Sequence, residues 1–421
     1  MIGRGRLRLG MLYAGRAELH RIGRLEEGQA LYESALSIAQ ALIDQDEASV
    51  EGRHLKADAL AALAHVQRLQ QDYAGALESI DAATDTAEAT LAQLPEEHDL
   101  LGTLESLRAS SIIERGNILV EEGMAAKDAS AQQRLADRAR LAFLDAMDKF
   151  QSMIDRDVDP DRGQIGKAHA LVRLAEWEIR SVAFDAQRAA SIDRSSMLDR
   201  LAEAEAFAQR ALPIYQDLQT RHPENGAYPR DRLIAVEAIA NIYRLRSDQY
   251  EALAQQDAGR AEELRQLAVE ARETSIAMLE DALRVGQRAF DADEANATLG
   301  RRLAMLQGRL GQSYEADGRL EEAKRMYAES VRQRETLAAV DPTPQHFNDA
   351  VVGWYRLGKL HEFLAENASE RTAQLEAALD AFMQAKSYVQ KQIDSGATPD
   401  NTHDQTIQDQ IDAVRQRLSS G

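Results

Sequence analysis

The residue pair His361-Glu362 begins a pattern that could hold a catalytic zinc ion. In His-Glu-x-x-His, two histidines one helical turn apart bind the metal and the glutamate acts as general base. The second histidine position is occupied by Ala365. The chain also has no cysteine, so thiolate ligands, thiol nucleophiles and disulfides are excluded. We therefore expect no zinc, and we expect His361 to be a packing residue.

Two further stretches resemble the beginnings of catalytic or nucleotide-binding loops. Gly311 and Ser313 fit the start of the nucleophile elbow Gly-x-Ser-x-Gly, but Glu315 replaces the second glycine. Gly166-Lys167 matches the core of a phosphate-binding loop, yet the earlier glycine and the following hydroxyl residue are missing. The signature motifs of protein kinases are absent as well. We expect neither a serine nucleophile nor a nucleotide site.

Alternating aspartates between two helical stretches could begin a calcium loop, because such loops take carboxylates from every second residue. The glycine at the sixth position and the bidentate glutamate at the twelfth are missing when the count begins at either of the first two aspartates. The aspartates are Asp155, Asp157, Asp159 and Asp161. The sequence therefore predicts no metal site, no cofactor and no catalytic residue.

The charge balance limits the classes of partner. The 421 residues include 50 Lys and Arg against 70 Asp and Glu, giving a net charge of −20. Such an acidic chain does not suit a general binder of nucleic-acid phosphates. Residues 1–24 hold six arginines and one acid, so a basic arm is the alternative there. No apolar run reaches the ~20 residues that span a bilayer. We expect a cytoplasmic protein that binds neither membrane nor nucleic acid.

Apolar residues recur at spacings of three and four, as in Leu303, Leu306, Leu310 and Tyr314. This period is typical of α-helices, and no useful strand-like alternation is found. Seven of the eight prolines lie between the helical runs, where proline marks a helix boundary. Pro213 lies inside an apparent helix, so we expect a kink or a restart there.

The clearest repeat signal is Leu310-Gly311 followed by Tyr314, then Ala323 and Tyr327. The stretch from Trp354 to Gly358, with Ala378 and Phe382, gives it again. The pattern resembles the tetratricopeptide repeat, W-x2-L-G-x2-Y followed by A-x3-F. Small residues at the eighth and twentieth positions let two antiparallel helices approach closely. The resemblance implies helical hairpins that bind other proteins.

The same frame can be followed through the chain. Seven units would have their first positions at Leu9, Ala57, Ala109, Ala168, Leu233, Ala304 and Val351. The spacings exceed the usual 34 residues. We therefore expect an all-α, right-handed α-solenoid of about seven elongated hairpins.

The expected boundaries are a basic segment at 1–8, a superhelix over 9–398, and a capping helix with tail at 399–421. The units lie near 9–50, 51–98, 99–160, 161–226, 227–294, 295–344 and 345–398. The capping helix has an apolar stripe made of Ile407, Ile411, Val414 and Leu418.

A narrower resemblance covers residues 302–342, from Arg302-Leu303-Ala304 to Asp341-Pro342. These residues are similar to extended repeats of roughly 50 residues in bacterial signalling proteins, often C-terminal to a serine/threonine kinase. The resemblance implies a scaffold or sensor module without catalysis. The alternative is a regulatory or oligomerising part of a signalling protein whose catalytic domain is not in this chain.

In this architecture, positions two, five, nine and twelve of each first helix face a concave groove. We expect these residues to bind a protein or peptide segment. In the assumed register they include His65, Arg68, Asn117, Glu176, Glu237, Asn241, Arg244, Gln312, Glu315, Tyr355, Lys359 and Glu362. The set does not match the clamp of lysines and asparagines that holds a chaperone C-terminus.

The N-terminal end of the array has no counterpart of the capping helix. Leu9, Leu12 and Leu19 would lie on or near an uncovered end face. Since repeats bury their apolar faces on neighbours, such an end needs a cover. We expect self-association or a preceding domain at this end.

Overall fold

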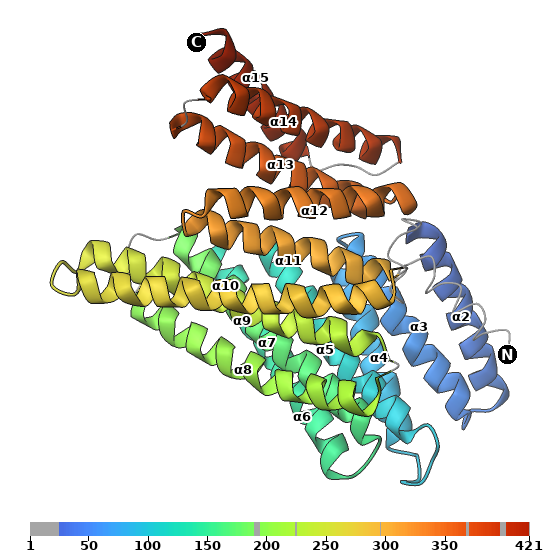
Figure 1. Ribbon diagram of the computed structural model, residues 1–421. Helices are drawn as coiled ribbons and strands as arrows, with labels where there is room; N and C mark the ends of the chain where they lie inside the picture. Colours follow the sequence, from blue (N-terminus) through green and yellow to red (C-terminus); the bar gives the residue numbers. More distant parts are fainter. Residues whose placement is uncertain are drawn as a thin grey trace. The chain divides into compact units, whose positions relative to one another are not determined.

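Every regular element in the described part of the chain is an α-helix (Figure 1). The computed structural model describes residues 25–188, 194–223, 225–294, 296–367, 370–395 and 401–420. The all-α class predicted from the sequence is confirmed. The basic N-terminal segment and the uncovered end face expected at Leu9, Leu12 and Leu19 lie outside the described residues.

The chain forms two compact units, Met1–Ala268 and Val269–Gly421. The first contains α2 (Leu25–Gln45), α3 (Val50–Leu69), α4 (Tyr73–Leu91), α5 (Leu101–Ala125), α6 (Ala129–Asp155), α7 (Pro160–Arg188), α8 (Arg194–Arg221) and α9 (Ala227–Gln256). The division lies within α10 (Ala261–Ala292). The second contains α11 (Ala297–Ala316), α12 (Leu320–Val340), α13 (Pro344–Asn367), α14 (Arg371–Asp394) and α15 (Asn401–Ser419).

Each helix of the first unit packs against the next one along the chain, from α2 to α9. The odd-numbered helices also contact one another, α3 with α5, α5 with α7, and α7 with α9. They therefore form an inner layer, and the even-numbered helices lie outside it. This is the arrangement of a helical-repeat protein, in which each hairpin rests on its neighbours.

The helices of the second unit also pack in chain order, from α11 to α15. Ile407, Ile411 and Val414 of α15 are buried in one cluster with residues of α13 and α14, and Leu418 packs against its edge. The predicted capping helix is therefore present and covers the last hairpin.

The helix boundaries follow from local sequence. Asp72, Asp128 and Asn296 each accept a hydrogen bond from the backbone N–H three residues further on, which caps the helix that follows. Pro160 is the first residue of α7, where its missing N–H costs nothing. Helix α8 runs continuously through Pro213, so the restart that we expected there does not occur.

The small residues at the twentieth repeat position pack at helix contacts. All six are at most 1 % exposed, which agrees with the expected register; they are Ala76, Ala139, Ala204, Ala268, Ala323 and Ala378. The eighth-position glycines serve the same contact. A Cβ on Gly311 would lie 2.8 Å from the ring of Tyr327, and one on Gly358 would lie 2.7 Å from the ring of Phe382. Any larger residue at these positions would require the facing aromatic ring to shift.

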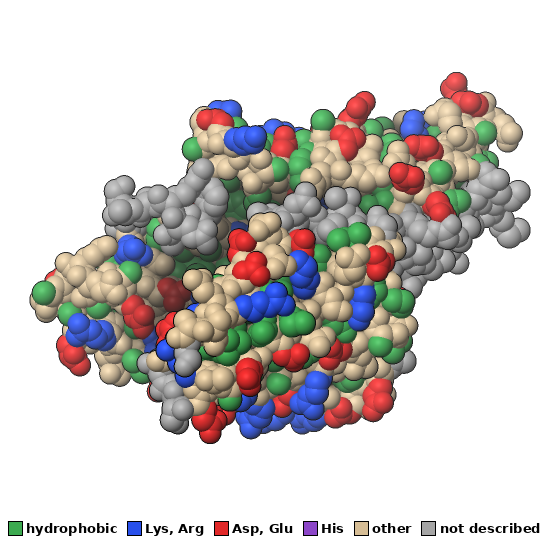
Figure 2. Space-filling view, turned by 90° about the horizontal axis from the view of Figure 1, so that it is seen from above, with side chains coloured by type: hydrophobic (Ala, Val, Ile, Leu, Met, Phe, Trp, Pro, Cys, Tyr) green, Lys and Arg blue, Asp and Glu red, His purple; other side chains and the backbone are tan. Residues whose placement is uncertain are grey.

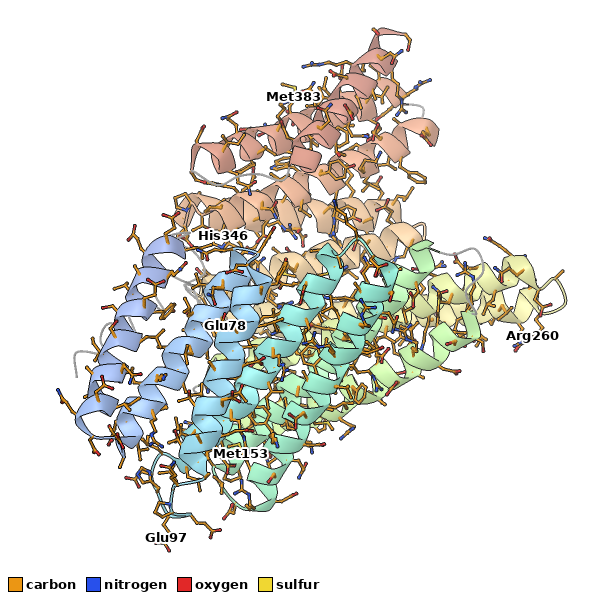
Figure 3. The ribbon with its side chains drawn as sticks, turned by 180° about the vertical axis from the view of Figure 1, so that it is seen from behind. Glu78, Glu97, Met153, Arg260, His346 and Met383 are labelled. Carbon is orange, nitrogen blue, oxygen red and sulfur yellow. The ribbon has the colours of Figure 1, made fainter. Side chains whose placement is uncertain are left out.

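Exposed charged side chains mark the hairpin ends. Glu97 lies in the connection after α4, and Arg260 lies in the turn between α9 and α10 (Figure 3). On the face drawn in Figure 2, acidic and basic side chains are interspersed and form no single-sign patch. None of the described helices is both long and apolar enough to cross a membrane.

Candidate partner-binding site

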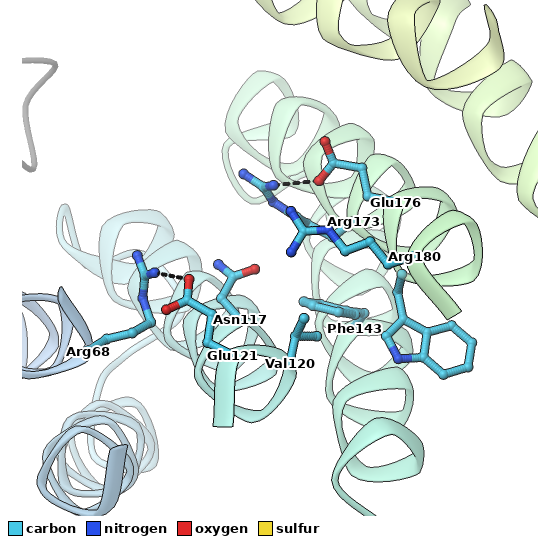
Figure 4. Close-up of a pocket in the computed structure, with 9 residues that line it drawn as sticks. Arg68, Asn117, Val120, Glu121, Phe143, Arg173, Glu176 and Arg180 are labelled. Atoms are coloured by element: carbon cyan, nitrogen blue, oxygen red, sulfur yellow. Dashed lines mark hydrogen bonds and ion pairs between the residues drawn. The ribbon is translucent and has the colours of Figure 1, made fainter. Parts of the chain in front are cut away.

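The inner helices α3, α5 and α7 bring four of the predicted groove residues into one region of the first unit. They are His65 of α3 and three residues drawn in Figure 4, namely Arg68 of α3, Asn117 of α5 and Glu176 of α7. Each lies at position nine or twelve of its repeat, on the helix face that neighbouring inner helices share.

A largely buried carboxylate, that of Glu114 on α5, organises three of these residues. Its oxygen atoms lie 3.0 Å from His65 Nδ1, 2.9 Å from Arg68 Nε and 3.1 Å from Asn117 Nδ2. Burial alone would raise the pKa of Glu114. The hydrogen bond with His65 and the charge of Arg68 outweigh burial and hold this pKa well below its usual range. The cluster is therefore a charged, hydrogen-bonded network that fixes α3 against α5.

The predicted residue Glu176 belongs to a second pair. Its carboxylate accepts a hydrogen bond from Arg173 Nη1 at 2.6 Å. The charge of Glu176 raises the pKa of Arg173, although burial acts in the opposite direction. On the other side, Arg68 also bonds to Glu121 of α5. Most charges at this site are therefore already paired within the chain.

A polar pocket of about 180 Å³ lies between these two pairs. It is lined by Arg68, Asn117, Val120, Glu121, Phe143, Arg173, Glu176, Trp177 and Arg180 (Figure 4). Arg180 differs from the other charged residues of the lining because it forms no hydrogen bond or ion pair with any described residue. Its exposed guanidinium group is free to bind an anionic group.

A second pocket of about 330 Å³ adjoins the first and shares Val120, Trp177 and Arg180 with it. Most of its exposed surface is apolar. Met124 of α5 lies in its wall and remains 58 % exposed, which is unusual for a large apolar side chain. The two pockets together offer an apolar hollow beside an unpaired cation.

The indole ring of Trp177 is held in place by two arginines. The guanidinium carbons of Arg140 and Arg200 lie 5.9 and 6.0 Å from the centre of the ring. Both arginines bond to the buried carboxylate of Glu178, at 3.3 and 3.0 Å. Because its neighbours are fixed by ion pairs, Trp177 gives the site a rigid aromatic wall.

The remaining predicted residues of the first unit lie on α9. The side-chain oxygen of Asn241 accepts a hydrogen bond from Arg244 Nε at 3.1 Å, and Arg244 also pairs with Asp248 at 2.9 Å. Glu237 is 9 % exposed. Helix α9 contacts α7, but these three predicted residues line neither of the two pockets.

Five predicted residues belong to the second unit. Lys359 and Glu362 of α13 bond to each other at 2.7 Å. They also contact the capping helix, Lys359 through Gln410 at 3.2 Å and Glu362 through Arg417 at 3.4 Å. Their contacts therefore hold α15 against α13.

The other three residues of that unit are Gln312, Glu315 and Tyr355. Glu315 accepts a hydrogen bond from the hydroxyl of Tyr327 at 2.8 Å. The ring of Tyr355 packs against that of Phe382, with 5.7 Å between the ring centres. Gln312 is partly exposed on α11.

Several residues that shape this site were not predicted from the sequence, namely Glu114, Arg173, Trp177, Arg180 and Met124. Glu114 and Arg173 both occupy position six of their repeats. Position six lies one helical turn after position two and three residues before position nine, so it shares the inner face. The helical period was the signal that could have found them.

No group of metal-binding side chains is found among the described residues. Asp161, from the aspartate loop, pairs with His222 at 2.7 Å and with Arg221. His361 is buried, and its Nδ1 lies 2.7 Å from Gln374 Oε1. Burial lowers the pKa of His361. These contacts agree with a packing role for His361.

A scan against protein-family models and a search of curated proteins both find no match. Solved structures give weak likenesses. The nuclear import adaptor Nro1 of S. pombe is 15 % identical over 98 % of this chain and 99 % of that chain, with a TM-score of 0.36. The designed helical repeat protein DHR64 is 19 % identical over 56 % of this chain and 98 % of that chain, with a TM-score of 0.31.

The TPR domain of P58(IPK) is 12 % identical over 100 % of this chain and 99 % of that chain, with a TM-score of 0.17. Scores of this size carry no argument about function.

Proposed function

We propose that the chain is a tetratricopeptide-type scaffold without catalysis of its own, which binds a segment of a partner protein on α5 and α7. The observation that carries the proposal is the apolar hollow between Met124 and Trp177, open beside the unpaired Arg180. Binding sites for peptides combine an apolar anchor pocket with a few placed polar groups in this way.

The chemistry of the lining defines the segment that it would accept. The hollow of about 330 Å³ suits one large apolar side chain, and Arg180 suits a carboxylate near it. Four charged residues of the lining already have partners, namely Arg68, Arg173, Glu121 and Glu176. They therefore shape the pocket and offer a ligand little uncompensated charge. We therefore infer a partner segment in which an aromatic or large aliphatic residue stands next to an acidic one.

The pocket walls favour binding in a second way. The inner helices are fixed by the buried Glu114 network and by the arginines around Trp177. A preorganised wall loses little side-chain entropy when a ligand binds, so more of the contact energy is available as affinity.

The narrower alternative places the chain in a bacterial signalling protein, as a regulatory or oligomerising part beside a serine/threonine kinase. It rests on the extended repeat of residues 302–342 alone. A cytoplasmic location belongs to the same proposal. A protein partner is common to both versions.

Selection from a random peptide library on the full chain tests the proposal. We expect the enriched peptides to carry an apolar residue next to an acidic one. Their binding should be lost in Met124→Ser and weakened at least about tenfold in Arg180→Gln.

Two matched variants serve as controls. Leu141 on α6 is 65 % exposed, and Arg210 on α8 is an exposed arginine without a partner among the described residues. Leu141→Ser and Arg210→Gln should bind like the unchanged chain. Equal losses in the controls, or no enrichment at all, would remove the support for this site.

A further inference from the structure

A buried arginine in the second unit has no carboxylate partner among the described residues. Arg334 of α12 is only 6 % exposed. Its Nη1 donates to the backbone carbonyl of Asp349 at 2.5 Å, and its Nε has no hydrogen-bond partner in the described structure. The carboxylate of Asp349 is bound instead by Arg301, at 2.5 and 3.2 Å. Because buried charges in proteins are normally paired, this guanidinium group needs a counter-ion.

A second arginine approaches the same point. Arg356 of α13 is partly buried and forms no hydrogen bond or ion pair with any described residue. Its Nη1 lies 3.4 Å from the place that a Cβ on Gly308 would take, and Arg334 Nη2 lies 3.7 Å from that place. The two nitrogens are therefore at most 7.1 Å apart. The hydroxyl of Ser330 lies 3.5 Å from the same point.

The guanidinium groups near Gly308 repel one another. Burial, together with the charges of Arg356, Arg301 and Arg309, lowers the pKa of Arg334 to about 10, while the charge of Asp349 opposes them. Burial and the charge of Arg309 also lower the pKa of Arg356. An anion between the two guanidinium groups would relieve this repulsion.

Two glycines let these arginines approach the helix backbones closely. Gly308 of α11 has no side chain, and an added methyl there would meet its neighbours only at ordinary contact distances. Gly353 of α13 allows the stem of Arg334 to pass, since a Cβ on it would lie 3.2 Å from Arg334 Cδ. The guanidinium groups of Arg334 on α12 and Arg356 on α13 therefore lie close together beside the backbone of Gly308 on α11.

We propose that Arg334 and Arg356 form a binding site over Gly308 for a phosphate-class oxyanion, either free or carried on a larger ligand. Charge-assisted bonds of about 2.7–2.9 Å from each arginine to oxygens of a single anion can bridge nitrogens at this separation.

The local charge favours a dianion. Neither Arg334 nor Arg356 is bonded to a carboxylate of any described residue, so the site offers two positive charges. A phosphoryl group carries about −1.5 to −2 at neutral pH and matches them. This site lies in the second unit and does not depend on the pocket at Trp177.

Calorimetric titration of the full chain with inorganic phosphate tests the proposal, with O-phosphoserine and acetate as parallel ligands. We expect phosphate to bind and to raise the thermal midpoint, as any ligand of the native state does. Arg356→Gln removes one donor, and Gly308→Ala adds a methyl 3.4 Å from Arg356 Nη1 and 3.7 Å from Arg334 Nη2, where it would crowd an anion bound to both. Each should weaken binding at least about tenfold.

The exposed arginine Arg332, also on α12, provides the control. Arg332→Gln should bind phosphate like the unchanged chain. Gly308→Ala keeps the test independent of misfolding, because alanine suits a helix better than glycine does, so its ligand-free midpoint should not fall.

Tighter binding of O-phosphoserine than of phosphate would identify a larger phosphorylated ligand, and equal binding would identify free phosphate. Both results support the site. The proposal is overturned if phosphate does not bind, if acetate binds as well as phosphate, or if Gly308→Ala and Arg356→Gln bind phosphate undiminished.

Discussion

Replacing Gly311 by alanine tests the helix packing at its closest point. Gly311 on α11 faces the ring of Tyr327 on α12, and a Cβ would lie 2.8 Å from both Cδ1 and Cε1 of that ring. Tyr327 is 3 % exposed, and its hydroxyl donates to Glu315 at 2.8 Å. The ring therefore cannot move aside without breaking a contact.

Two opposing effects determine how far Gly311→Ala changes the free energy of unfolding. Alanine in a helix interior is favoured over glycine by about 1 kcal/mol. Forcing an extra carbon into a packed contact costs about 1–3 kcal/mol. Gly311→Ala should therefore lower the free energy of unfolding by about 0–2 kcal/mol. Gly308→Ala, one turn away on α11, meets only ordinary contacts and should raise it by up to about 1 kcal/mol.

Urea denaturation followed by circular dichroism measures both variants, and Tyr327→Leu completes the comparison. In the Tyr327→Leu background the ring is gone, so Gly311→Ala should no longer destabilise the chain and should even stabilise it. If Gly311→Ala stabilises the unchanged chain as much as Gly308→Ala does, the helix contact described here is wrong.

Three further outcomes are expected. Ala323→Leu overpacks a fully buried contact and should cost about 1–3 kcal/mol in chemical denaturation; an unchanged midpoint would contradict the register. Because the pKa of Glu114 is depressed, its carboxylate stabilises the fold above the unfolded pKa near 4.5, and this contribution is lost as the pH falls through the folded value. At pH 7 the unchanged chain should have a larger free energy of unfolding than Glu114→Gln, and this difference should shrink below about pH 4.5. A difference that stays constant from pH 7 downward would refute the charge assignment. A chain ending at Ser395 lacks α15 and uncovers the last hairpin. Each buried aliphatic side chain contributes about 1.5–3 kcal/mol as an upper estimate, so the free energy of unfolding should fall by several kcal/mol. Hydrogen exchange in α13 and α14 should become faster.

The fold could be predicted because its determinants are local and periodic. Small residues such as Ala323 and Ala378, at a fixed distance from the eighth-position glycines, identify close helix contacts without any knowledge of the tertiary structure. Pro160 and Pro344 begin helices, where a missing N–H is tolerated. The division of the chain after Ala268 could not be predicted, because it falls inside a continuous helix with no break in composition.

The site could be predicted only in part. His65, Arg68 and Asn117 were identified from their repeat positions, but their common partner Glu114 was not. Pairing depends on packing between residues that are 46 to 53 positions apart, as in Arg68 with Glu114 and Glu121. Sequence periodicity gives the face of a helix and not the partner opposite it. For the same reason it could not distinguish the paired Arg68 from the unpaired Arg180.

The central claim is that a partner segment binds on the inner helices α5 and α7. Hydrogen exchange of the full chain, with and without an enriched peptide, tests it most directly. The account predicts slower exchange in residues 113–124 and 173–185, with little change in the outer helices α4 and α8. Protection confined to those outer helices, or unchanged exchange in α5 and α7 at saturating peptide, would contradict it.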